Sequence, residues 1–271
     1  MTAAEKYALC VKGLKEFAQQ AGFSQAVIGL SGGIDSALVA TMSVDAFGAD
    51  NVHGVLLPGP YSSSHSVTDA RTLAENLNIA DSTISIVKPF EAFNSAFFDA
   101  GLAPLKGSAS ENTQARCRMV CLMALSNAHN WMLVNTGNKS EALVGYATLH
   151  GDMAGAYGPI GGLYKTEVFE LSRWRNAQGE AEGTGAPIPR NILEKAPSAE
   201  LSPDQEDEKC LGVTYEELDR ILMLLAEEDK TAEEIVASGF DKALVDHVFT
   251  LVKRNAFKRR FAPPFPQNII H

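Results

Sequence analysis

Apolar and polar positions alternate along the first half of the chain in a way that predicts strands separated by helices. Short apolar runs indicate four strands, at 25–30, 52–58, 82–89 and 131–136. Apolar positions recur with helical spacing in four further segments, at 2–20, 36–47, 66–77 and 111–130. Short apolar strands connected by helices are typical of a parallel sheet that is covered on both faces. We therefore predict an α/β fold with helices on both faces of a parallel sheet.

Three details of this half bear on its packing and on the place of a ligand. Ser66, with Asp69 three residues later, predicts the cap of the third helix. The segment from Met119 to Leu125 is apolar on every side, which predicts burial all round. A ligand of such a sheet binds beyond the carboxyl ends of the strands, and Gly32 and Thr136 fall at two of these ends.

The second half of the chain is mainly helical from Gly151 onward. Helical spacing predicts three helices, at 164–176, 215–229 and 242–257. The segments 177–187 and 196–210 are polar or rich in glycine and proline, so we expect loops there, the second long enough to move. We expect one domain over residues 1–271, in which 1–150 form the sheet core and 151–271 complete the site.

Charge and composition narrow the class of protein. The chain carries 23 lysines and arginines against 33 aspartates and glutamates, a formal net charge of −10, which disfavours nucleic acid as the main partner. The basic segment 253–260 is the exception, and the simplest interpretation of it is the solvated end of a helix. No apolar run reaches membrane-spanning length, so we expect a cytoplasmic protein that binds no membrane.

Cysteine and histidine give no sign of a metal centre. The six histidines are scattered singly, and no two cysteines form a C-x-x-C pair. We expect buried, reduced thiols at Cys10, Cys117, Cys121 and Cys210.

The stretch IGLSGGIDSALVA, residues 28–40, is the most specific feature of the sequence. It predicts a buried strand, a glycine turn and the start of a helix. The glycines let backbone N–H groups approach an anion, and the helix N-terminus adds partial positive charge. Asp35 would repel a bare phosphate, but it suits a site where a magnesium ion lies between it and a polyphosphate. The pattern differs from the Walker loop and from G-x-G-x-x-G.

The segment SGGIDS resembles the SGGxDS signature of the ATP pyrophosphatases, also called N-type or PP-loop enzymes. That resemblance implies a loop that holds the pyrophosphate of ATP. The group includes GMP, asparagine and argininosuccinate synthetases, enzymes that thiolate tRNA or form lysidine, and NAD synthetases. The loop alone does not choose among them.

Two further blocks resemble the NAD synthetases within this group. One is NTGNKSEALVGYATLHGDMAGAYGPIGGLYKTEVFELSRWRN, and the other is ILEKAPSAELSPDQEDE. ENTQARCRM and the terminal NAFKRR also fit in order and spacing, so the resemblance covers nearly the whole chain. It implies a Rossmann-like, adenine nucleotide alpha hydrolase-like sheet and a homodimer. It also implies that deamido-NAD, ATP and ammonia give NAD, AMP and pyrophosphate through an adenylate, with Mg²⁺ as cofactor.

The resemblance also implies roles for individual residues. The expected ATP-binding residues are Gly29, Leu30, Ser31, Gly32, Gly33, Ile34, Asp35, Ser36, Thr136, Lys165 and Ser198. The expected residues for deamido-NAD are Arg116, Glu141 and Lys258. The expected magnesium ligands are Asp35 and Glu141, and Asp152 and Lys165 are the expected catalytic residues, Asp152 receiving or orienting ammonia.

Several of these roles have structural alternatives. Thr136 is also placed to cap the following helix, and Asp152 is also placed to cap a loop backbone, which is the more common role of such a residue. Arg118 is close enough in sequence to Arg116 to be confused with it. Glu141 faces the metal or the dinucleotide, depending on the member of the family.

The chain departs from some NAD synthetases in positions near the dinucleotide. Phe257 stands where some have a histidine, and Leu149 and Ala156 stand where some have a lysine and an aspartate. Many members carry an N-terminal amidase domain that makes ammonia from glutamine. Only 30 residues precede SGGIDS, so we expect direct use of ammonia, although 118–141 resembles the glutamine-using members and a separate glutaminase partner stays open.

Two other functions stay open at this stage. One is another PP-loop ATP pyrophosphatase, either an amidotransferase synthetase subunit or a tRNA-modifying enzyme. A tRNA-modifying enzyme would need a basic RNA face or paired catalytic cysteines. The other is a non-catalytic ATP-binding module, which would bind ATP without releasing pyrophosphate. The carboxylate pair and the second lysine favour an enzyme.

Overall fold

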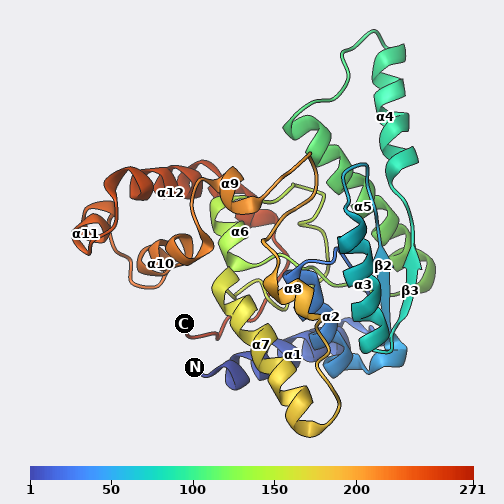
Figure 1. Ribbon diagram of the computed structural model, residues 1–271, viewed down its shortest axis with the longest axis horizontal. Coiled ribbons are helices and arrows are strands. Elements are labelled where there is room, and N and C mark those ends of the chain that lie inside the picture. The colour runs from blue at the N-terminus through green and yellow to red at the C-terminus, as the bar shows by residue number, and fades with distance from the viewer.

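The computed structural model describes residues 1–271 and contains a four-stranded parallel sheet, whose strands β2 and β3 are seen toward the right of Figure 1. The strand order is β3–β2–β1–β4, and all three pairings are parallel. The bounds are Ala26–Gly29 for β1, Val52–Leu56 for β2, Ala80–Thr83 for β3 and Met132–Leu133 for β4. An isolated parallel bridge between Val134 and Tyr157 continues the sheet beside β4. The predicted parallel α/β sheet is confirmed.

Helices cover both faces of this sheet. Successive strand residues point to opposite faces, so each inner strand contributes side chains to both cores. Ile28 packs into a core on one face, and its neighbour Val27 packs into a separate core on the other. The helices of the first face are α1 (Ala3–Ala21), α2 (Ile34–Phe47), α3 (Ser64–Asn76), α7 (Lys165–Glu182) and α8 (Arg190–Glu194). Those of the second face are α4 (Val87–Asp99) and α5 (Ser108–His129).

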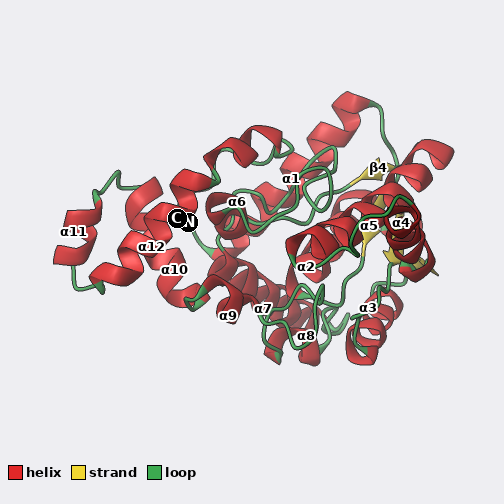
Figure 2. Ribbon diagram, turned by 90° about the horizontal axis from the view of Figure 1, so that it is seen from above, coloured by secondary structure: helices red, strands yellow, loops and turns green.

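The remaining helices form a third cluster to one side of the sheet (Figure 2). Val144 and Tyr164, which flank the site segments, pack into this cluster. Its helices are α6 (Lys139–Val144), α9 (Asp207–Leu211), α10 (Tyr215–Ala226), α11 (Ala232–Ala237) and α12 (Lys242–Arg254). Two 3₁₀ helices, η1 (Ala49–Asn51) and η2 (Ala256–Phe261), complete the fold.

The predicted strand at 82–89 was wrong beyond its first residues. β3 ends at Thr83, α4 begins at Val87, and all four residues of β3 are exposed at the edge of the sheet. The apolar signal came instead from Ile84 and Ile86, which pack into the core of the second face just before α4. An exposed edge strand needs no apolar residues, so the pattern marked the turn that follows it.

The cap of α3 also differs from the prediction. The helix begins at Ser64, and the Ser63 Oγ accepts a hydrogen bond from the Ser66 amide. Ser63 therefore caps the helix, and Ser66 lies in its first turn.

The segment from Met119 to Leu125 is not buried all round. None of its residues is fully buried, and Val120 is 60% exposed, because only one side of α5 packs on the sheet. Residues 177–187 are not entirely a loop either, since α7 continues to Glu182 and ends on Gly183. Alanine and glutamate are good helix formers, which explains this extension. Helices α4, α8, α9 and α11 were not predicted, and α9 occupies part of the expected loop 196–210.

The thiols follow the prediction in part. Cys10 and Cys117 are buried and Cys121 is half-buried, but Cys210 is exposed, and all four are free. Each helix is too short or too polar to serve as a membrane-spanning segment.

Candidate active site

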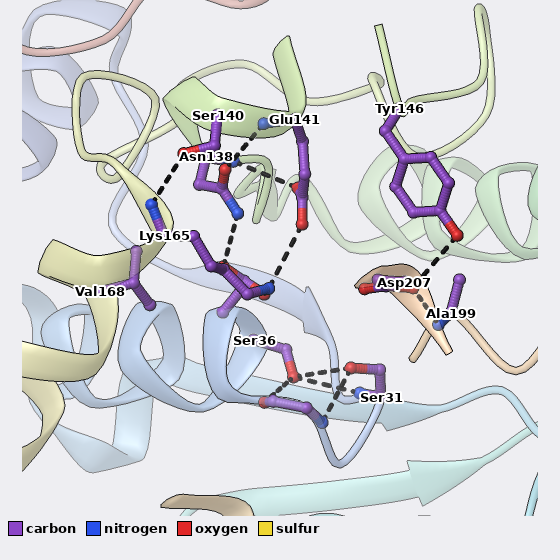
Figure 3. Close-up of polar contacts among 12 residues, drawn as sticks. Ser31, Ser36, Asn138, Ser140, Glu141, Tyr146, Lys165, Val168, Ala199 and Asp207 are labelled. Carbon is purple, nitrogen blue, oxygen red and sulfur yellow. Dashed lines mark hydrogen bonds and ion pairs between the residues drawn. The ribbon is translucent and has the colours of Figure 1, made fainter. Parts of the chain in front are cut away.

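The glycine turn between β1 and α2 is held by its own serine side chains. The Ser36 Oγ lies 3.0 Å from the Ser31 Oγ, accepts from the Ser31 amide and donates to the Gly33 carbonyl (Figure 3). The first hydrogen bond of α2 runs from Ala37 to Gly33, so the N–H groups of the first turn have no partner within the helix. They form an anion-binding end at the carboxyl edge of the sheet.

Gly32 lies where no other residue fits. Its φ is +76°, and a Cβ there would approach the backbone oxygen of Ser66 to 2.2 Å. The turn is therefore packed directly against the first turn of α3.

A lysine between two carboxylates faces this turn. The Lys165 Nζ lies 2.5 Å from Asp35 Oδ2 and 3.3 Å from Glu141 Oε1. Asn138 caps α6 with its side chain and also donates from Nδ2 to Asp35 Oδ1 at 2.9 Å. Thr136 is thus not the cap of this helix, although it lines the same cavity.

Electrostatics couples these three charges. The Lys165 side chain is only 2% exposed, and burial alone would lower its pKa, but Asp35 and Glu141 outweigh burial and raise that pKa. Burial raises the pKa of Glu141, and Lys165 offsets only part of this rise. The carboxylates of Asp35 and Glu141 lie beside the same cation, Lys165, in the cavity. Magnesium commonly uses one or two carboxylates together with substrate phosphates, so this pair suits a magnesium ion. No group of three or more His, Cys, Asp or Glu residues is arranged to hold a metal without such help.

Asp219, from α10, positions the start of α7. Its carboxylate accepts from the Ser140 hydroxyl at 2.5 Å and from the Thr166 amide at 2.8 Å. The Ser140 Oγ in turn accepts from the Lys165 amide at 2.9 Å. The helical cluster therefore fixes the first turn of the helix that carries Lys165.

The glycine turn, Asn138 and the three charged residues Asp35, Glu141 and Lys165 line one cavity of 360 Å³. The expected site residues that line it are Gly29, Leu30, Ser31, Gly33, Ile34, Asp35, Ser36, Thr136, Glu141, Asp152, Lys165 and Ser198. Of the remaining three, Gly32 turns toward α3, and Arg116 and Lys258 are not among the lining residues.

Asp152 is surrounded by protein yet open to solvent from the cavity. Burial raises its pKa, and the Thr148 amide, which donates to Oδ1 at 2.5 Å, opposes this rise. Its backbone also matters, because Asn135 Nδ2 donates to the Asp152 carbonyl at 2.8 Å. Asp152 therefore both braces a loop and presents a carboxylate to the cavity.

The chain matches the family model described as NAD synthase over residues 6–262. The chain belongs to the NAD synthase family. It is 46% identical over 268 residues to a glutamine-dependent NAD(+) synthetase of Rhodobacter capsulatus, covering 97% of this chain and 48% of that protein. It is 43% identical to a glutamine-dependent NAD(+) synthetase of Thermotoga maritima, covering 95% and 44%. The chain thus spans about half the length of these curated relatives.

Solved structures agree with the family. The NMN synthetase of Francisella tularensis matches with a TM-score of 0.79 and 33% identity over 96% of both chains. The NH₃-dependent NAD synthetase of Campylobacter jejuni matches with a TM-score of 0.74 and 30% identity, over 95% of this chain and 96% of that one. The fold and the family are therefore established.

Within this NAD synthase fold, two of the expected dinucleotide-binding cations lie outside the cavity. Arg116 is exposed, and its Nε donates to the Leu149 carbonyl at 3.2 Å. The Lys258 Nζ donates to the carbonyls of Gly145 and Ala147, at the end of α6. Arg118, in contrast, lines the cavity and donates from Nε to the Leu57 carbonyl.

The segment 196–206 closes one side of the cavity and is tied to α3. The Glu200 carboxylate accepts from the Ser63 amide at 3.0 Å, the Ser63 hydroxyl at 2.8 Å and the Ser66 hydroxyl at 2.7 Å. Gln114 of α5 holds the neighbouring Leu201 carbonyl at 2.9 Å. Because Gly32 packs on Ser66, the same helix end supports both the glycine turn and this segment.

We expect the variant E200A to loosen this segment. Charge-assisted hydrogen bonds contribute about 1.5–3 kcal/mol each, so loss of the carboxylate should raise the rate of proteolytic cleavage within 196–206 about tenfold or more. Limited proteolysis with mapping of the cleavage site checks this. D204A is the matched control, because Asp204 lies exposed on the same segment. Equal cleavage rates for E200A and D204A would contradict the prediction.

Sequence reasoning missed several residues of the site. Asn138 lies inside the quoted GNKSE block, and its position as a helix cap was the available signal. Tyr146 and Asp207 meet at 3.1 Å across the cavity wall, a contact between segments 61 residues apart that no local pattern indicates (Figure 3). Glu200 lies in the quoted SAEL block. Its partners are at the start of α3, whose cap is Ser63, three residues before the predicted cap Ser66.

Proposed function

We propose that the chain catalyses ATP-dependent amidation of deamido-NAD to NAD, with release of AMP and pyrophosphate. The observation that carries this proposal is the meeting of Asp35, Glu141 and Lys165 over the glycine turn, in a chain of the NAD synthase family. Adenylation turns the nicotinate carboxylate into an electrophile that an amine can attack. The site has mainly to neutralise charge and align the partners.

In this mechanism the glycine turn binds the polyphosphate of ATP. The first-turn N–H groups of α2 donate to the phosphate oxygens, and the hydroxyls of Ser31 and Ser36 rotate from their contacts within the turn to donate as well. Asp35 and Glu141 would hold Mg²⁺, which neutralises phosphate charge when bound. Lys165 lies between these carboxylates, and its ammonium group stabilises the negative charge that develops on the leaving pyrophosphate. Thr136 and Ser198 face the same space and contact ATP.

Asp152 serves the second half of the reaction in this proposal. Its raised pKa makes it a better proton acceptor near neutral pH than an ordinary carboxylate, and it faces the cavity. It orients ammonia and receives the proton that is lost as the amide forms. Arg116, Glu141 and Lys258 are proposed to hold deamido-NAD, with Arg118 as the cavity-lining alternative to Arg116.

The relatives differ in their nitrogen donor: the curated ones are named glutamine-dependent, and one solved structure is named NH₃-dependent. We propose that this chain itself uses ammonia. The support is that it aligns over 96% of the length of the NH₃-dependent structure.

One assay tests reaction, acid substrate and donor together. Purified protein with Mg²⁺ and ATP is given deamido-NAD or nicotinate mononucleotide, each with ammonium or with glutamine. The mononucleotide is included because the Francisella tularensis relative is named an NMN synthetase. NAD from deamido-NAD and ammonium supports the proposal. If only the mononucleotide is amidated, it replaces deamido-NAD as the proposed substrate. If NAD forms only when glutamine is supplied, glutamine replaces ammonia as the proposed donor.

The assay also decides between the two other functions considered. ATP binding with no pyrophosphate release with either acid would indicate the non-catalytic module. Pyrophosphate release only in the presence of tRNA would indicate a tRNA-modifying enzyme.

We also propose a homodimer. Val120 on α5 and Phe98 on the neighbouring α4 are 60% and 72% exposed, and large exposed apolar side chains mark contact surfaces. We expect a dimer in sedimentation equilibrium, and a monomer for V120D. Q20E is the control, because Gln20 is an exposed polar position on α1, which packs on the other face of the sheet. A wild type that sediments as a monomer would refute this part.

A further inference from the structure

A buried histidine lies behind the candidate site rather than in it. The His271 side chain is only 6% exposed. Its Nδ1 lies 3.0 Å from both carboxylate oxygens of Glu167, and its Nε2 lies 3.0 Å from the Lys139 Nζ. An ammonium group has only donors, so Nε2 accepts from Lys139 and Nδ1–H donates to Glu167. The ring therefore joins a donor on one side to an acceptor on the other.

The two residues that hydrogen-bond to this ring, Lys139 and Glu167, lie in the first turns of α6 and α7, the helices that carry Glu141 and Lys165. Lys139 is the first residue of α6, directly after Asn138, the cap that contacts Asp35. Glu167 lies in the first turn of α7, two residues after Lys165, and its carboxylate accepts from the amide that precedes Lys165 at 2.8 Å. One side chain thus connects the two helix starts whose residues meet at Asp35.

The surroundings make this bridge rigid. Lys6 of α1 forms a buried ion pair with Glu167, and Lys139 forms a second pair with Glu227 at 2.5 Å. Burial would raise the pKa of Glu167, but the hydrogen bonds from His271 and Lys6 outweigh burial and lower it. Buried polar groups that are fully paired fix geometry, because each alternative arrangement leaves one of them without a partner.

The segment that leads to His271 is also part of the cavity wall. Ala262, Pro263 and Phe265 line the cavity, and the Pro264 carbonyl accepts from the Gly158 amide at 2.9 Å. This segment therefore connects the bridge behind the site with the wall of the site itself.

We propose that His271 is a positioning residue for the ATP subsite: by joining Lys139 and Glu167 it sets the distance between α6 and α7, and so the approach of Glu141 and Lys165 to Asp35. This inference rests on the proposed function for its kinetic consequence, but not for its effect on ATP binding. No atom of His271 contacts substrate in this role.

The test compares H271L, H271Q and I270A with wild type. Leucine fills a similar volume without hydrogen bonds, whereas glutamine offers one donor and one acceptor. Ile270 is 68% exposed and serves as the neighbouring control. We expect H271L to weaken binding of Mg·ATP in calorimetry about tenfold, the effect of losing two buried hydrogen bonds, and H271Q to recover most of it. In NAD synthesis, the KM for ATP should rise with the same ranking, while the KM for deamido-NAD should change less than twofold.

Three outcomes would overturn the proposal. The first is ATP binding by H271L equal to that of wild type. The second is equal loss in H271L and H271Q, which would indicate packing alone. The third is equal loss in I270A, which would indicate a general effect of the segment. A wild type that binds ATP but makes no NAD refutes the proposed function, and the binding comparison still decides the role of His271.

Discussion

The variant K165M should lose catalysis almost completely, with kcat/KM for ATP lower by about 10²–10³-fold, the usual effect of removing one preorganised charge from a transition state. Lys165 is the cation that pairs with both Asp35 and Glu141, and methionine fills its volume without charge. Steady-state kinetics of NAD formation measures the loss. K12M is the control, since the Lys12 side chain on α1 is 67% exposed and does not line the cavity.

The same variant should also change how stability depends on pH. Removing one member of a buried ionic group costs about 3 kcal/mol or more, because the remaining charges lack a partner. Burial holds the pKa of Glu141 above its ordinary value, so without Lys165 the folded state binds more protons than the unfolded state. The free energy of unfolding of K165M should therefore fall as pH rises from about 5 to 8, more steeply than that of wild type.

Urea unfolding at several pH values checks this. A pH profile of K165M parallel to that of wild type would show that Lys165 does not compensate these carboxylates. The kinetic loss without any pH effect would then point to a role on substrate alone.

The sequence predicted the central sheet well because its inner strands are buried on both faces. Val27 and Ile28 belong to two different cores, so apolar residues run continuously and mark β1 without ambiguity. The edge strand β3 has no buried residue, and its apolar neighbours displaced the prediction by several positions. The prediction for α5 was wrong in the opposite sense, because it expected burial of Met119–Leu125 and the structure leaves this segment partly exposed. An apolar helix surface in the sequence does not say what covers it.

The candidate site was predictable as far as its residues lie in short blocks. Asp35, Glu141 and Lys165 come from three such blocks, and the fold brings them together. The supports of the site were not predictable, because they are contacts over long sequence separations between ordinary residue types. Asp219 braces Ser140, and Lys6 pairs with Glu167 across 161 positions. Nothing local in the sequence distinguishes these side chains from solvated ones.

The variant G32A should disrupt the glycine turn. At φ +76° an alanine is strained by about 1 kcal/mol, and its Cβ would also lie 2.2 Å from the Ser66 oxygen and 2.8 Å from the Ser66 carbonyl carbon. Since both atoms are backbone, the turn or the first turn of α3 has to move. We expect the free energy of unfolding to fall by about 2–4 kcal/mol in total, combining backbone strain and overpacking. The KM for ATP should rise at least tenfold, because the displaced turn carries the phosphate-binding N–H groups.

The variant G22A separates the two causes. Gly22 ends α1 with nearly the same φ, +78°, but a Cβ there meets nothing within 4 Å. It should therefore lose only the strain term, about 1 kcal/mol, and keep its KM for ATP. The difference between G32A and G22A in urea unfolding then measures the close approach to Ser66. If G32A lost no more stability than G22A, the contact between the glycine turn and α3 would be too soft to position either of them, and the coupling between the turn and Glu200 would fail with it.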